Sequence, residues 1–366
     1  MDIVAAIQRV VEGQHLDRLE AEAVMEEIMS GKATDAQIAA FLTALRMKCE
    51  TVEELIGFAR VMRAKASPVR PRSAVEAAFS GTEREMLVDT CGTGGDAAGT
   101  FNISTATAFV VAGAGVRVAK HGNRSVSSLC GSADVVEALG IRIDLAPEDV
   151  ARCIDEAGIG FLYAPLLHSA MRHVMLARRE MKIRTVFNLL GPLCNPAGAN
   201  AQVLGVYSEK VSDMMAQVLC ALGCRRALVV HGLDGLDEIT VSGETKICEV
   251  RDGEVKSYYV VPEDFGLTRA PIGQIQGGDA ARNAEIIREV LSGHESTRRD
   301  VVLLNAAAGL VAGGKARHLR EGIELARNSI SSGAAAAKLK QLILISRSLD
   351  AMRRSQESGV RSQENG

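Results

Sequence analysis

Apolar residues recur every three or four positions along the first 66 residues, a pattern that predicts amphipathic helices and no strand. Four segments carry this pattern: residues 2–13, 16–31, 34–49 and 51–66. Thr51 and Glu54 have the spacing of a capping box, and Gly13 and Gly31 stand where helices would end. The segment SPVRPRS, residues 67–73, then breaks the periodicity and is predicted to be a linker.

Beyond the linker, short apolar runs alternate with helical patterns, which is typical of a parallel α/β sheet. Strands are predicted at residues 86–92, 116–122, 141–147, 159–165 and 226–232, and helices at residues 104–115, 132–140 and 147–158. We therefore expect a helical domain and a larger α/β domain. The expected boundaries are residues 1–68, joined in space by a helical insertion at about 166–185, then 72–165 with 186–348, and a polar, disordered tail at 349–366.

Composition narrows the class of protein. The chain is 47% hydrophobic and 24% charged, with a formal net charge of −3, so no basic surface for nucleic acid is indicated. Aromatic residues make up only 3% of the chain, too few for platforms on which bases stack. No apolar run approaches the roughly 20 residues that span a bilayer, and the N-terminus carries acids and no cleavage site. We expect a soluble cytoplasmic protein without a membrane or nucleic-acid partner.

The eight cysteines are scattered and form no CxxC pair. Cys220 and Cys224 stand four apart on a helical pattern, so a zinc site and buried free thiols are the two interpretations to weigh. Free thiols are the better interpretation for a cytosolic protein.

A glycine-rich stretch, DTCGTGGDAAGTFNIST at residues 89–105, raises three phosphate-binding hypotheses. A dinucleotide fingerprint would open directly into a helix, whereas here the helix is expected only near Ser104. The nearest P-loop match, GLVAGGKA at 309–316, lacks the final hydroxyl and lies at a helix end. Two interpretations therefore remain. The stretch is either a phosphate cradle of main-chain N–H groups that face the start of the next helix, or an ordinary glycine-rich turn. Asp96 in such a cradle would suit sugar hydroxyls or the outer shell of a metal ion.

Two further polar turns are expected at the same carboxyl edge of the sheet, where open α/β folds bind ligands. KHGNR, residues 120–124, offers Lys120 to a phosphate group, and several serines follow it. Asp237 and Glu238 adjoin each other in HGLDGLDEIT and form either a solvated surface pair or a Mg²⁺ site. Their expected convergence with the glycine loop favours a polyphosphate site.

Six motifs, in this order and spacing, closely resemble the anthranilate phosphoribosyltransferases. They are GTGGD (92–96), NIST (102–105), KHGNRSVSS (120–128), GSADVVEALG (131–140), FNLLGPLCNPA (187–197) and DGLDE (234–238). The resemblance covers about residues 3–345. It implies a small N-terminal helical domain hinged to a larger α/β domain with a mainly parallel sheet, and a homodimer through the helical domain. It also implies transfer of the 5-phosphoribosyl group from phosphoribosyl pyrophosphate to the amine of anthranilate, with Mg²⁺, in tryptophan biosynthesis.

The resemblance also assigns site residues by position. For phosphoribosyl pyrophosphate it implies Gly92, Thr93, Gly94, Gly95, Asp96, Thr100, Asn102, Ser104, Thr105, Lys120, Ser128 and Ser132. For anthranilate it implies Gly92, His121, Asn123, Arg178, Gly191 and Pro192, and for the metal Ser104, Asp237 and Glu238. Cys194 and Leu129-Cys130 depart from the family pattern as we expect it, at positions that supply no catalytic proton or metal ligand.

The chemistry implied needs no dedicated acid or base, because an arylamine is already neutral at pH 7. Lys120 and Asp96 are expected to act electrostatically, and His121 is expected to orient backbone. Arg178 could hold the anthranilate carboxylate with its planar fork, or belong to a solvated basic helix face. Two alternative functions stay open: a pyrimidine nucleoside phosphorylase, and a non-catalytic relative that binds nucleic acid.

Overall fold

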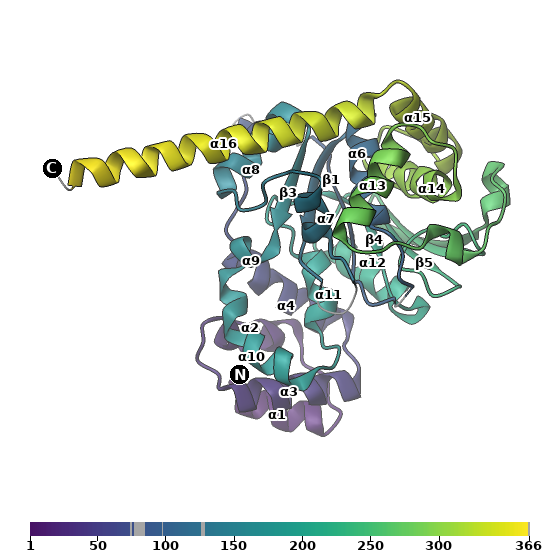
Figure 1. The fold of residues 1–366 in the computed structure, drawn as a ribbon. Helices are drawn as coiled ribbons and strands as arrows, with labels where there is room; N and C mark the ends of the chain where they lie inside the picture. Colours follow the sequence, from purple (N-terminus) through teal and green to yellow (C-terminus); the bar gives the residue numbers. More distant parts are fainter. Residues whose placement is uncertain (74, 77–84, 97, 126–128, 365–366) are drawn as a thin grey trace.

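The computed structural model describes residues 1–73, 75–76, 85–96, 98–125 and 129–364, with the backbone alone for 352–364. The chain forms a helical unit and a larger α/β domain, which confirms the predicted fold class (Figure 1). The helical unit consists of α1 (Ile3–Val11), α2 (Arg18–Met29), α3 (Asp35–Lys48), α4 (Val52–Lys65) and α10 (Arg172–Met181). α10 packs against α2 and α3, so a segment distant in sequence completes this unit.

Local capping explains where the N-terminal helices begin. The Thr51 hydroxyl accepts the N–H of Glu54, and the Glu54 carboxylate accepts the N–H of Thr51, which confirms the predicted capping box of α4. The same reciprocal arrangement opens α3 at Thr34. Gly13 and Gly31 follow α1 and α2 with φ of +77° and +70°, backbone conformations that favour glycine.

Glu54 has a second role as the buried acid of the helical unit. Its side chain is fully buried, and its Oε1 accepts the backbone N–H of Leu16 at 2.9 Å. Its Oε2 accepts the ammonium of Lys48, also at 2.9 Å, and the Lys48 side chain is only 2% exposed. This buried ion pair connects the end of α3 to the start of α4.

The α/β domain is organised around one sheet with the strand order β3-β2-β1-β4-β5-β6-β7 in the described residues. The strands are β1 (Leu87–Gly92), β2 (Arg117–Gly122), β3 (Ile159–Tyr163), β4 (Ala201–Gly205), β5 (Arg226–Gly232), β6 (Thr245–Arg251) and β7 (Glu254–Val260). The first five in this spatial order run parallel, and β6 and β7 are antiparallel. All five parallel strands therefore end at one edge.

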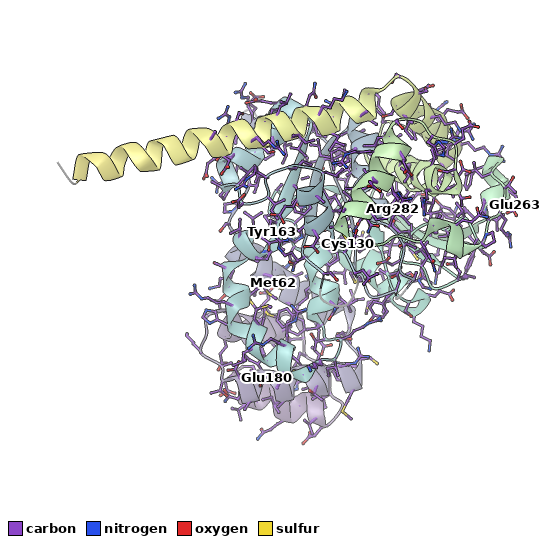
Figure 2. The ribbon with its side chains drawn as sticks, in the orientation of Figure 1. Met62, Cys130, Tyr163, Glu180, Glu263 and Arg282 are labelled. Carbon is purple, nitrogen blue, oxygen red and sulfur yellow. The ribbon has the colours of Figure 1, made fainter. Side chains whose placement is uncertain are left out.

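Helices cover both faces of the sheet. They are α6 (Ile103–Gly113), α7 (Ser132–Ala138), α8 (Pro147–Ala157), α12 (Ser212–Ala221), α13 (Ala280–Leu291), α14 (Thr297–Ala312), α15 (Leu319–Ser331) and α16 (Ala334–Glu364). Shorter helical turns are α9 (Ala164–Leu167), α11 (Phe187–Leu193), η1 (Ser169–Met171), η2 (Glu209–Val211), η3 (Pro262–Phe265) and η4 (Ile272–Ile275). In Figure 2, Tyr163 at the end of β3 lies toward Met62 of the helical unit, so the carboxyl edge of the sheet faces that unit.

Two apolar clusters form the core, and they lie on opposite faces of the sheet at β4, β5 and β6. Alternate residues of these three strands enter different clusters, as in β4 with Val203 on one face and Leu204 on the other. The cluster that contains Leu204 continues through α12 and α11 into α4 and the rest of the helical unit. The helical unit therefore shares its core with one face of the sheet.

One predicted strand is wrong, and three observed strands, β4, β6 and β7, were not among those predicted. The alternation at 141–147 is real, because Ile141 and Ile143 are buried, but this segment joins no sheet. Its Arg142 N–H instead donates to the Ser346 hydroxyl of α16 at 3.1 Å. Of these, β4 is short and buried at every position, so its sequence shows no alternation of apolar and polar residues.

The C-terminal segment also differs from the prediction. Residues 349–366 were expected to be a disordered tail, whereas α16 continues to Glu364 and extends beyond the α/β domain as a long helix (Figure 1). No proline interrupts this segment, and its arginine, glutamine and glutamate residues favour helix. Polarity in this segment therefore did not indicate loss of helical structure.

Among the residues with described structure, no helix combines the length and the apolar character required to cross a membrane.

Replacing Glu54 by glutamine should reduce the free energy of unfolding by about 3 kcal/mol, because Lys48 would remain buried without a negative partner. Urea denaturation followed by circular dichroism measures this loss. Glu53→Gln is the matched control, because Glu53 forms an exposed ion pair with Arg18 and should cost less than about 1 kcal/mol. Equal losses in the two variants would contradict a special role for the buried pair.

Candidate active site

The carboxyl ends of β1 and β2 lie side by side and carry the two polar turns predicted from the sequence. Gly92 ends β1 and pairs in register with Gly205, the last residue of the neighbouring β4. The Lys120 ammonium, near the end of β2, donates to the carbonyl oxygen of Thr90 and, at 3.1 Å, to the hydroxyl of Ser104. Lys120 therefore connects both strand ends to the start of α6.

Asp89 is a buried carboxylate that holds these strand ends in place. Its Oδ1 accepts the backbone N–H of His121 at 3.1 Å, and its Oδ2 accepts the side-chain amide of Asn195 at 2.8 Å. The same amide nitrogen also donates to the carbonyl oxygen of Ala119 at 2.8 Å. Burial raises the pKa of Asp89, and the contacts with Asn195 and Lys120 act in the opposite direction. Asp89 thus ties β1, β2 and the segment after α11 together.

The glycine loop after β1 adopts a conformation and a close contact that require glycine. Gly94 and Gly95 have φ of +66° and +79°. The N–H of Gly94 donates to Oδ2 of Asp237 at 3.0 Å, and a Cβ atom at Gly92 would lie 2.8 Å from the same oxygen. The bare backbone therefore allows the acidic loop to lie directly on the glycine loop.

The loop after β5, which carries Asp237 and Glu238 and is called the acidic loop here, reaches β1 because it crosses the end of β4. A Cβ atom at Gly205 would overlap the carbonyl oxygen of Asp237, so only glycine fits at the end of this strand. The next residue, Glu238, accepts a hydrogen bond from the backbone N–H of Ser104, at the start of α6. The glycine loop, the end of β2 at Lys120 and the pair Asp237-Glu238 thereby meet at one edge of the sheet, as predicted from the sequence. Gly205 itself had not been identified.

Three carboxylates, those of Asp96, Asp237 and Glu238, influence one another's charge at this edge. Burial, followed by the charge of Asp96, raises the pKa of Asp237 to about 7. Burial and the charge of Asp237 also raise the pKa of Glu238 well above its ordinary value. Lys120 is adjacent, but burial lowers its pKa, and its charge interacts with Asp89 as well as with Asp237 and Glu238. The cluster is short of positive charge, and a cation would stabilise it.

The donor set fits a magnesium ion that arrives with a phosphorylated substrate. The described residues contain no group of three His, Cys, Asp or Glu side chains placed to hold a metal ion by themselves. Mg²⁺ usually takes only one or two carboxylates and completes its shell with water and phosphate oxygens. The predicted ligands Ser104, Asp237 and Glu238 lie together, and Asp237 and Glu238 provide such carboxylates.

Two residues predicted to bind phosphoribosyl pyrophosphate, Asn102 and Thr105, lie at the start of α6. The Asn102 carbonyl oxygen accepts from the amide of Asn283 at 3.0 Å, and its own amide nitrogen donates to the Cys130 carbonyl at 3.3 Å. Thr105 is 1% exposed, so its hydroxyl lies inside the protein. The roles of Asn102 and Thr105 in binding phosphoribosyl pyrophosphate stay predictions, and α13, distant in sequence, contributes Asn283 to the surroundings of Asn102.

The remaining predicted residues lie around the same edge or outside the described chain. The hydroxyl of Ser132 accepts the N–H of Asn123 at 3.2 Å, so the start of α7 supports the turn after β2. Thr100 forms an isolated antiparallel bridge with Gln276. Ser128 lies outside the described residues.

Two buried histidines adjoin the backbone of α11. The rings of His121 and His168 have centroids 5.0 Å apart. Burial first, and then the neighbouring His168, lowers the pKa of His121 to about 3, while burial lowers that of His168 to about 4. Both are therefore neutral at pH 7, and His121 also contacts the backbone of Gly191. A Cβ atom at Gly191 would meet nothing within 4 Å, so its backbone faces open space. His168 was not predicted as a site residue because it lies outside all six sequence motifs.

Arg178 lies beside the first residue of α11. Its guanidinium is 5.4 Å from the ring centroid of Phe187, the first residue of α11, and the residue is half-buried. Burial lowers the pKa of Arg178, and no ion pair with Arg178 occurs within the described part of the chain. A half-buried cation without an acid is a suitable partner for a ligand carboxylate.

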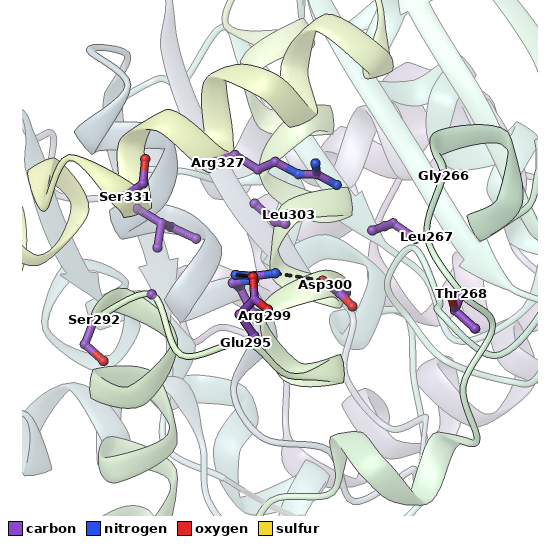
Figure 3. Close-up of a pocket in the computed structure, with 12 residues that line it drawn as sticks. Gly266, Leu267, Thr268, Ser292, Glu295, Arg299, Asp300, Leu303, Arg327 and Ser331 are labelled. Atoms are coloured by element: carbon purple, nitrogen blue, oxygen red, sulfur yellow. Dashed lines mark hydrogen bonds and ion pairs between the residues drawn. The ribbon is translucent and has the colours of Figure 1, made fainter.

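A hollow of about 660 Å³ lies elsewhere in the α/β domain, at the start of α14 and against α15 (Figure 3). Three of its four charged residues pair with each other, because Arg299 contacts Glu295 at 3.1 Å and Asp300 at 3.9 Å. None of the residues predicted for either substrate lines it. The hollow is therefore separate from the site at the strand ends.

Comparisons with known proteins agree with this geometry. Residues 84–336 match the α/β domain of the glycosyl transferase family, and residues 4–66 match the helical bundle domain of that family. The anthranilate phosphoribosyltransferase of Pelotomaculum thermopropionicum is 59% identical over 338 residues, covering 92% of this chain and 95% of that protein. That of Geobacter sulfurreducens is 55% identical over 346 residues, covering 94% and 99%.

Solved structures give the same result. The anthranilate phosphoribosyltransferase of Thermus thermophilus superposes with a TM-score of 0.86 at 43% identity, covering 93% of this chain and 99% of that one. The Saccharomyces cerevisiae enzyme in complex with PRPP and Mg superposes with a TM-score of 0.83 at 27% identity, covering 94% and 98%. By sequence, fold and site geometry, this chain belongs to the anthranilate phosphoribosyltransferase family.

Proposed function

We propose that this chain transfers the 5-phosphoribosyl group of phosphoribosyl pyrophosphate to the amine of anthranilate, giving N-(5-phosphoribosyl)anthranilate and pyrophosphate, in tryptophan biosynthesis. The observation that carries this proposal is the meeting of the glycine loop, residues 92–96, with Asp237 and Glu238 beside Lys120. Relatives from the same family bind PRPP with Mg and, in another complex, 4-fluoroanthranilate.

The glycine loop and the start of α6 would hold phosphoribosyl pyrophosphate. Backbone N–H groups of the loop and the positive end of α6 favour phosphate oxygens. Asp96 would accept hydrogen bonds from the ribose hydroxyls. Ser104, Asp237 and Glu238 would hold Mg²⁺, which when bound would neutralise negative charge on the pyrophosphate.

Anthranilate would lie between α11 and the turn after β2. Arg178 would bind its carboxylate, and the exposed Asn123 offers an amide at the end of β2. The neutral rings of His121 and His168 and the open backbone of Gly191 suit an uncharged aromatic ring.

In the reaction, the bond between ribose C1 and the pyrophosphate oxygen breaks, and its electron pair leaves with the oxygen. The lone pair of the amine forms the new C1–N bond, and the proton of the resulting cationic nitrogen passes to solvent. Because the arylamine is neutral at pH 7, a strong base is unnecessary, and a pKa of about 3 makes His121 a poor one. Loop N–H groups stabilise the leaving group, and positioning of the two substrates contributes up to about 7–11 kcal/mol.

The two alternative functions receive no support from a specific contact. An acidic cluster at the strand ends opposes a nucleic-acid strand. Relatives at 59% and 55% identity carry the name of the transferase and not of a nucleoside phosphorylase. A cytoplasmic location remains a prediction.

The protein would act as a homodimer joined through the helical unit. Apolar side chains on this unit face outward, including Val11 at 68% and Met47 at 82% exposure. Light scattering should then give about twice the chain mass of 38.8 kDa, and Val11→Asp should shift the protein toward the single-chain mass. A single-chain mass for the unaltered protein at micromolar concentration would contradict the dimer.

The activity itself is tested by the loss of anthranilate fluorescence when the protein is mixed with phosphoribosyl pyrophosphate and Mg²⁺. Chelation of the metal should slow the reaction about 100-fold or more, because the charge on the leaving group is then uncompensated. Phosphorolysis of thymidine or uridine is measured in parallel. Phosphorolysis without loss of anthranilate would replace the proposal by the nucleoside phosphorylase alternative.

Arg178→Ala should raise the KM for anthranilate about tenfold to 100-fold, because charge-assisted hydrogen bonds to the carboxylate are lost. The KM for phosphoribosyl pyrophosphate should change less than about twofold. Arg179→Ala is the matched control, since Arg179 is the next residue on α10 and is exposed. Equal increases in both KM values would remove Arg178 from the anthranilate site.

A further inference from the structure

Arg184 lies at a junction that the six sequence motifs do not include. Its guanidinium donates to the carbonyl oxygen of Gly95 in the glycine loop and lies 4.6 Å from the ring centroid of Tyr207. Arg184 is half-buried and, within the described part of the chain, forms no ion pair with an acid. Its contacts are therefore a loop carbonyl and an aromatic face, both of which suit a planar guanidinium.

Tyr207 connects this junction to the glycine loop and to the helical unit. Its backbone N–H donates to the hydroxyl of Thr93 at 3.1 Å. Burial and then the charge of Glu50 raise the pKa of its phenol, and Arg46 acts in the opposite direction. Arg46 and Glu50 stand at the end of α3 and directly after it. The Tyr207 side chain therefore lies within electrostatic reach of the helical unit.

Arg184 also occupies the short connection between α10 and α11. Lys182 follows the last residue of α10 with a left-handed φ of +52°, and α11 begins at Phe187. The connection thus joins the helix that carries Arg178 to the helix that carries Gly191. A displacement of Arg184 would act directly on the two elements that form the anthranilate side of the site.

We propose that Arg184 is a positioning residue that couples diphosphate binding at the glycine loop to carboxylate binding at Arg178. This inference rests on the proposed function. A diphosphate that orders residues 93–95 would fix the Gly95 carbonyl, and this carbonyl would hold Arg184 and the connection between α10 and α11. Arg178 and the α11 backbone would then be placed for the aromatic acid before it binds. The coupling is reciprocal, so each ligand raises the affinity of the protein for the other ligand by the same factor.

The test measures anthranilate affinity by fluorescence, with and without saturating magnesium pyrophosphate, which cannot react. We expect magnesium pyrophosphate to tighten anthranilate binding of the unaltered protein at least about fivefold, within the usual range for coupled sites. In Arg184→Ala, the factor by which magnesium pyrophosphate tightens anthranilate binding should fall to nearly 1. Arg184→Lys should also lose most of it, because an ammonium cannot stack on Tyr207 and donate as a planar fork. Arg179→Ala should keep the full factor.

The reciprocal titration follows pyrophosphate affinity with and without anthranilate by calorimetry, and should give the same factor in each protein. A purely structural defect would weaken both ligands singly and leave this factor unchanged, which would overturn the inference. A coupling factor of 1 in the unaltered protein would overturn it as well. Failure of the proposed function is separate: the unaltered protein would then not consume anthranilate with phosphoribosyl pyrophosphate.

Discussion

The hydrogen bonds of the buried Asp89 are the constraint on which the site geometry depends. Its two oxygens accept from the His121 backbone and from the Asn195 side chain, at 3.1 Å and 2.8 Å. These bonds fix the end of β2 and the segment after α11 to β1, so they connect the two halves of the proposed site, one for the diphosphate and one for the aromatic acid. Because a buried carboxylate is costly unless its oxygens are satisfied, loss of either partner would disturb both halves together.

A second constraint is the close approach of backbone to carboxylate at the strand ends. Gly205 permits the loop after β5 to cross β4, and Gly92 permits Asp237 to lie on the glycine loop. The price is a group of desolvated acids, seen in the raised pKa values of Asp237 and Glu238. A protein fold retains such a cluster where a ligand supplies the missing positive charge.

The sequence predicts those parts of the structure that depend on local chemistry. Capping at Thr51 and the strand that ends at Gly92 are local patterns, and both are confirmed. The convergence of the polar turns follows from the rule that parallel strands end at one edge. The sequence fails where distant segments decide the outcome. The alternation that begins at Ile141 is satisfied by packing under α16, and β4 is buried at every position and so shows no alternation. Arg184 belongs to no motif, and only the folded chain shows its contacts with the glycine loop.

The core that the helical unit shares with one face of the sheet has a mechanical consequence. Apolar residues run without interruption from α4 through α11 and α12 to β4 and β5. The linker is also fastened, because the Val69 N–H donates to the Pro196 carbonyl at 3.0 Å. A swinging motion about this linker would have to open close-packed apolar surface to water. Small sliding movements between packed helices, a shear in which interlocked side chains stay in contact, would leave this shared core closed to water.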